Sequence, residues 1–67
     1  MNLKKMSTAG ILKMYGGIRE ALEVDDNSPN GGKPYGVREF SDWREWAEMF
    51  ESELDSRVDV KYEKIRW

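Results

Sequence analysis

The chain has 67 residues, of which 36% are charged, a formal net charge of −2, and neither cysteine nor histidine. These two absences exclude disulfides, thiol nucleophiles and histidine-based catalysis, and they remove the usual ligands of structural zinc. A domain of this size buries only about 60% of the surface of its unfolded chain, so aromatic packing or self-association has to support it. We therefore expect one domain, residues 1–67, that is not an enzyme and has no catalytic residues, metal or cofactor.

The sequence has no apolar run long enough for a membrane span or a secretory leader. Lys13 and Arg19 interrupt the apolar residues that follow Lys4 and Lys5. The lack of cysteine suits a reducing compartment. We predict a cytoplasmic protein without membrane contact.

The first expected element is a helix over residues 8–24, capped by Ser7 or Thr8. One apolar stripe at helical spacing consists of Ile11, Tyr15, Ile18 and Leu22. A narrower stripe consists of Gly10, Met14, Gly17 and Ala21. The interior glycines, Gly16 and Gly17, cost about 1 kcal/mol each relative to alanine. Either the two glycines kink the helix, or they let a large side chain approach it closely.

Residues 25–40 are predicted to be a long loop, because they contain Pro29, Asn30-Gly31-Gly32 and Pro34-Tyr35-Gly36. Asp26, Ser28, Asn30 and Gly31 are spaced like the opening of an EF-hand calcium loop. The bidentate acid of that loop would fall at Val37, and Glu39 comes two residues too late, so we expect no calcium site. Residues 37–40 alternate and are predicted to be a short extended piece.

The second expected element is a helix over residues 42–56 with Ser41 as its N-cap. Its apolar stripe, Trp43, Trp46, Ala47, Phe50 and Leu54, is the clearest pattern in the sequence. We interpret this stripe as core, with its indoles on the glycine face of the first helix at Gly10 and Gly17. In that packing, Gly17→Leu should destabilise the fold by about 1 kcal/mol or more.

The last expected element is a β-strand over residues 58–66, where the apolar period changes from 3.6 to 2. Its pairing partner stays open between residues 2–6, residues 37–40 and the same strand of a second copy. The predicted fold class is therefore α+β: an antiparallel two-helix hairpin with a long Gly/Pro loop and a short C-terminal strand.

For function, the aromatic and basic residues outside the predicted core favour protein binding, since such residues dominate interfaces. We expect a small non-enzymatic interaction or accessory protein that self-associates as a homodimer. Its predicted binding residues are Lys33, Tyr35, Arg38, Phe40, Tyr62 and Trp67.

Two alternatives rest on the charge distribution. In the first, Glu48, Glu51 and Asp55, which share one helix face, imitate a phosphate backbone. The chain would then be a small acidic inhibitor of a nucleic-acid-binding protein, such as those that phages encode. The other alternative is direct nucleic-acid binding through a basic set, Lys4, Lys5, Lys13, Arg19 and Lys33. We rank nucleic acid below protein as a partner, because the acidic second helix would repel a phosphate backbone.

Overall fold

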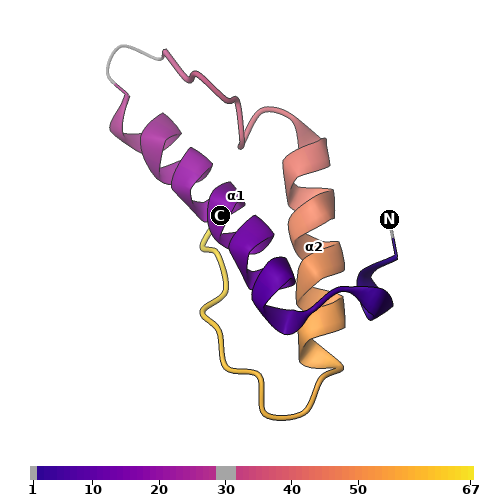
Figure 1. Cartoon of the computed structure of the whole chain (residues 1–67). Coiled ribbons are helices and arrows are strands. Elements are labelled where there is room, and N and C mark those ends of the chain that lie inside the picture. Colours follow the sequence, from indigo (N-terminus) through magenta and orange to yellow (C-terminus); the bar gives the residue numbers. More distant parts are fainter. Residues whose placement is uncertain (1, 29–31) are drawn as a thin grey trace.

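Two long helices dominate the computed structural model, which describes residues 2–28 and 32–67 (Figure 1). Helix α1 spans Thr8–Asn27, helix α2 spans Ser41–Asp55, and a short 3-10 helix, η1, spans Leu3–Lys5. Helices α1 and α2 run in opposite directions and diverge toward the segment that connects them (Figure 1). The predicted helical hairpin is confirmed.

The predicted C-terminal strand is wrong, and with it the α+β class. No strand forms among the described residues, and residues 60–67 are extended chain without a ladder partner. Because an isolated strand is unstable, this segment satisfies its backbone with side chains instead. The Ile65 N–H donates to Tyr15 Oη at 2.9 Å, and Arg19 donates to the carbonyl of Glu63. Of the alternating apolar residues, Val60 and Tyr62 pack against the core, whereas Val58 is 85% exposed.

The ends of the helices differ from the prediction by small amounts. Ser7 is the N-cap of α1, and its Oγ accepts the N–H of Gly10 at 3.0 Å, as predicted. Ser41 is the first residue of α2, and Phe40 holds the cap position without a side-chain hydrogen bond. The predicted extended piece at residues 37–40 is a tight turn, in which the N–H groups of Glu39 and Phe40 both donate to the Gly36 carbonyl.

The core lies between the two helices and under the C-terminal segment. It contains the predicted stripe of α1 and the inner residues of α2, together with Val37 from the loop and Ile65 from the C-terminal segment. Its buried apolar members are Ile11, Tyr15, Ile18, Ala21, Leu22, Val37, Ala47, Phe50, Leu54 and Ile65. In the described part of the chain, neither helix has the length and hydropathy that crossing a membrane requires.

Arg57 holds the end of α2 to the start of the chain. Its guanidinium donates to the carbonyls of Leu3 and Met6 at 2.9 and 2.8 Å and to Thr8 Oγ1 at 2.9 Å. It also pairs with Glu53 at 2.9 Å, and both side chains of this pair are largely buried. The planar guanidinium of arginine carries five N–H donors, so these bonds can form at the same time.

Candidate functional site

The connecting segment is organised by Asp25, a buried carboxylate at the end of α1. Asp25 is only 2% exposed, and its two oxygens accept the N–H groups of Tyr35 at 2.9 Å and Val37 at 2.7 Å. Its backbone carbonyl accepts Lys33 Nζ at 2.5 Å. The carboxylate therefore closes the loop onto α1.

Lys33 and Arg38, two of the predicted binding residues, are used inside the chain. Lys33 donates to the backbone carbonyl of Asp25, and Arg38 forms a bidentate ion pair with Asp26, in which both N···O distances are 3.0 Å. The Arg38 hydrogen bond lowers the pKa of Asp26. This pair is about half exposed, so it adds little stability, but it occupies a guanidinium that a partner would need.

Tyr62 lies in a cluster that fixes the C-terminal segment on the helices. Its ring meets Tyr15 edge-on at 5.6 Å between centroids, and its hydroxyl donates to Asp55 at 2.6 Å. Tyr15 donates to Glu51 at 2.5 Å, and burial together with this hydrogen bond raises the pKa of Tyr15 to about 12. Burial and the bond to Asp55 raise the pKa of Tyr62 as well. Both hydroxyls are therefore protonated donors at neutral pH.

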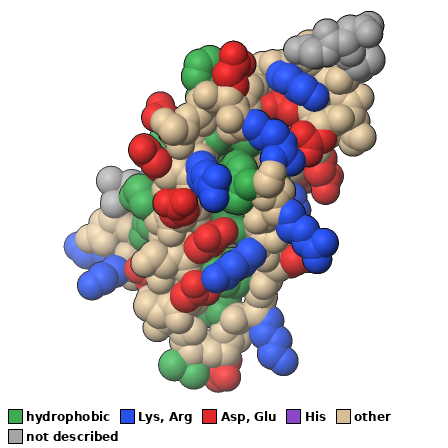
Figure 2. Space-filling model, turned by 180° about the vertical axis from the view of Figure 1, so that it is seen from behind, with side chains coloured by type: hydrophobic (Ala, Val, Ile, Leu, Met, Phe, Trp, Pro, Cys, Tyr) green, Lys and Arg blue, Asp and Glu red, His purple; other side chains and the backbone are tan. Residues whose placement is uncertain are grey.

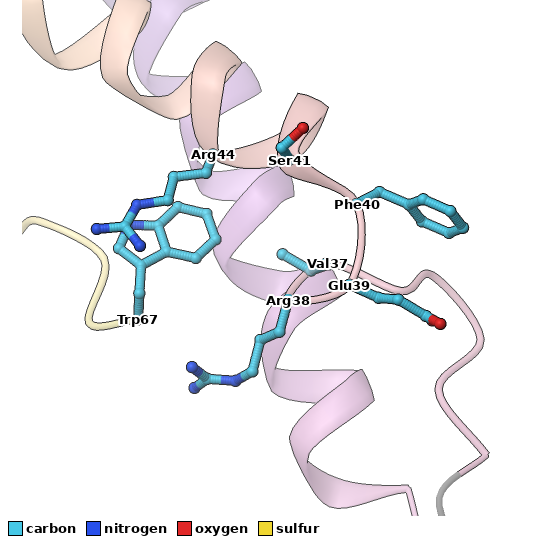
Figure 3. A pocket seen from close by; sticks show the side chains of 7 residues that line it. All are labelled: Val37, Arg38, Glu39, Phe40, Ser41, Arg44 and Trp67. Atoms are coloured by element: carbon cyan, nitrogen blue, oxygen red, sulfur yellow. The ribbon is translucent and has the colours of Figure 1, made fainter.

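Trp67 and Phe40 border an open pocket of about 370 Å³ beside the start of α2 (Figure 3). The Arg44 guanidinium lies over the Trp67 ring, 5.7 Å from its centroid, a cation–π contact. Phe40 and Glu39 point away from this pair, and Arg38 extends separately below it (Figure 3). The side chains diverge, so the pocket does not present converging groups to a ligand.

Each member of the predicted acidic face has a partner within the chain. Glu48 lies 3.6 Å from Arg44, Glu51 accepts the Tyr15 hydroxyl, and Asp55 accepts Tyr62 and pairs with Lys64 at 3.3 Å. The bonds from Tyr62 and Lys64 lower the pKa of Asp55. Seen from behind, acidic and basic side chains are interspersed over the surface (Figure 2). In that view, basic side chains lie between the acidic ones (Figure 2).

The surface that the sequence did not predict is an apolar groove between the two helices. It is lined by Met14, Gly17 and Ile18 from α1 and by Trp43, Trp46 and Phe50 from α2, and has a volume of about 410 Å³. We call these six residues the interhelical groove. The C-terminal segment contacts Tyr15, Arg19, Arg44 and Asp55, none of which lines the groove.

The groove continues along α1 into a second depression of about 230 Å³. Gly17 and Trp43 belong to both depressions, and the second adds Glu20, Ala21, Val24 and Tyr35. Tyr35 stands edge-on against Trp43 at 6.2 Å, which places one predicted binding residue at this surface. Trp46 in the groove is 53% exposed and Val24 in the second depression is 47% exposed. Exposed apolar side chains gathered in this way are typical of interaction sites.

The predicted packing of indoles onto the glycine face is wrong. A Cβ built on Gly17 would have no neighbour within 4 Å, and one on Gly10 would meet only Ser7 and Met6. Trp43 and Trp46 border the groove at some distance from the glycine, so Gly17 forms an open notch in the wall of α1. Met49 also falls beside Trp46 on α2, three residues on, and this spacing is the signal that could have placed Trp46 at the edge of the core.

The described residues show no metal site. They contain no group of three or more acidic, histidine or cysteine side chains that could hold an ion. Of the calcium-like spacing, Asp26 is paired with Arg38, whereas Asn30 and Gly31, like Pro29, lie outside the described residues. Every buried side-chain nitrogen and oxygen in this part of the chain also has a hydrogen-bond partner. The groove therefore presents apolar contact rather than polar coordination.

No family model matches the chain, and neither a curated protein nor a solved structure matches it. The candidate site therefore rests on the geometry of this chain alone.

Proposed function

We propose that this chain is a small non-enzymatic interaction protein that works by binding a protein chain in the interhelical groove. The observation that carries the proposal is the exposure of Trp46 beside an unfilled notch at Gly17. A folded chain of this size gains from burying every aromatic side chain that it can. An indole left half exposed above an empty notch is therefore available to contact another surface.

The two charge-based alternatives receive less support. Phosphate mimicry needs unpaired carboxylates along the helix, and Glu48, Glu51 and Asp55 each contact a basic or hydroxyl group of the same chain. Of the five basic residues of the nucleic-acid alternative, Arg19 and Lys33 donate to backbone carbonyls, which leaves only the exposed Lys4, Lys5 and Lys13 for phosphate groups. The proposal keeps the cytoplasm as the compartment, which the lack of cysteine suits.

Site-specific photocrosslinking tests the proposal. Trp46 is replaced by a photoreactive phenylalanine analogue, and Val58, which is 85% exposed and does not line the groove, receives the same analogue as the control. We expect protein adducts from position 46 in a lysate of the source cells and far fewer from position 58. Equal labelling from both positions, or none from position 46, would contradict the proposal.

A further inference from the structure

We propose that the partner in the interhelical groove is a second copy of this chain, docked face to face about a two-fold axis that runs along the groove. This inference rests on the proposed function and names its partner. It requires that one patch of the surface be complementary to itself, because a two-fold interface uses the same patch on both copies.

The patch contains both a projection and a matching notch. Trp46 projects from the α2 wall, and Gly17 leaves the α1 wall open across the groove from it. Rotation by 180° about an axis along the groove exchanges the two walls. The indole of each copy then lies over the glycine of the other, and the contact forms twice.

The same rotation gives a regular arrangement of helices. It keeps the direction of each helix along the axis, so α2 of one copy lies over α1 of the other, and these two run in opposite directions (Figure 1). All four helices then have antiparallel neighbours, as in four-helix bundles. Val24, in the depression that continues from the groove, is then covered as well.

The exposed apolar residues extend beyond the groove itself, and this extent favours a second copy over a single bound helix. Val24 lines the depression that continues from the groove, and Met49 on α2 is 46% exposed without lining either depression. One helix seated in the groove would leave Met49 exposed, whereas a second copy brings two helices to this surface. A two-fold contact through one apolar face also closes after two copies.

Oligomeric state is the first test. Sedimentation equilibrium should show a monomer–dimer equilibrium with a Kd between about 1 µM and about 1 mM. The tryptophan emission should shift to shorter wavelengths as the fraction of chains in the dimer rises. A chain that stays monomeric at about 1 mM overturns the inference.

A matched pair of substitutions places the contact. Gly17→Glu and Gly16→Glu add the same charge to adjacent positions of α1, and neither position has an atom within 4 Å of a built Cβ. Only Gly17 lines the groove. We expect Gly17→Glu to weaken the dimer at least tenfold and Gly16→Glu to change it less than threefold. Equal effects at both positions overturn the inference.

Complementation tests the two-fold geometry itself. Gly17→Glu and Trp46→Lys should each be monomeric alone, and circular dichroism checks that each is folded; Trp46→Arg, which supplies a cation at the same position, takes the place of Trp46→Lys if that variant unfolds. Mixed together, they should form a heterodimer with one native indole–glycine contact and one glutamate–lysine contact. Absence of a heterodimer from two folded variants overturns the two-fold arrangement.

The outcome for the proposed function is read separately. The masses of the adducts from position 46 show whether the crosslinked chain is a second copy. Adducts with a different protein, together with a monomer in solution, overturn this inference and leave the proposed function standing. A lack of adducts from position 46 contradicts both.

Discussion

The two interior glycines of α1 should be sites where alanine stabilises the protein. Cβ atoms built on Gly16 and Gly17 have no neighbour within 4 Å, so a methyl group meets no steric resistance. Alanine is favoured over glycine by about 1 kcal/mol inside a helix, because glycine loses more backbone freedom on folding. For a domain of this size, 1 kcal/mol raises Tm by roughly 4–8 °C. We expect each substitution to give about this increase.

Gly10 and Gly36 should respond differently to replacement by alanine. At Gly10 a Cβ would lie 3.1 Å from the capping Ser7 Oγ, so the gain in helix propensity is offset by crowding of the cap. Gly36 has φ +65° and a Cβ there would lie 2.8 Å from the Phe40 ring. Phe40 is exposed and its ring can move away, but the left-handed backbone remains, at a cost of roughly 1–2 kcal/mol for alanine.

Thermal unfolding of the four alanine variants, at a low protein concentration where the monomer dominates, gives the measurement. The expected order of Tm is Gly16→Ala and Gly17→Ala above wild type, Gly10→Ala near wild type, and Gly36→Ala below it. A decrease in Tm for Gly17→Ala would refute the reasoning. It would mean that Trp43 or Trp46 does press on Gly17 and that the groove is closed in solution.

Two further predictions concern buried hydrogen bonds. Asp25→Ala should lower the free energy of unfolding by about 2 kcal/mol, because it leaves the N–H groups of Tyr35 and Val37 without acceptors, and urea denaturation measures the loss; a change below about 0.5 kcal/mol would contradict the role of Asp25. In alkali, stability should fall from about pH 10 to pH 12 by about 1.4 kcal/mol per pH unit for each tyrosine whose pKa is raised by folding, because a free tyrosine ionises near pH 10 whereas Tyr15 keeps its proton to about pH 12 and the pKa of Tyr62 is raised as well. Tyr15→Phe should lose about half of this decrease in a urea titration across that pH range, and an unchanged pH profile in the variant would refute the assignment to Tyr15.

The sequence patterns correctly predicted those parts of the structure that depend on residues close together in the chain. The stripe from Ile11 to Leu22 and the cap at Ser7 fixed α1, because helical hydrogen bonds join residues four apart. The stripe also continues to Asp25, fourteen residues after Ile11, which is a signal that this carboxylate is buried. An acid followed by Asp26 and Asn27, however, also resembles the start of a loop, so the stripe alone does not predict this burial.

The parts that were wrong depend on contacts between distant residues. Alternation from Val58 to Tyr62 predicts an extended chain with one buried side, but it cannot tell whether a strand or a helix face covers that side. Trp46 shares its stripe with Phe50, and the sequence alone does not show how far across α2 the first helix reaches. The groove exists because the helices cover Phe50 and leave Trp46 outside.

The hydrogen bonds of Arg57 also bear on the speed of folding. Both helices involve only local contacts, and such helices form within about a microsecond. Arg57, however, reaches Thr8, Met6 and Leu3 across 49, 51 and 54 residues, and Ile65 reaches Tyr15 across 50. Closing such long loops requires the chain to lose entropy before these bonds form. This small helical protein should therefore fold more slowly than its secondary structure suggests, with a rate set by when the C-terminal segment docks.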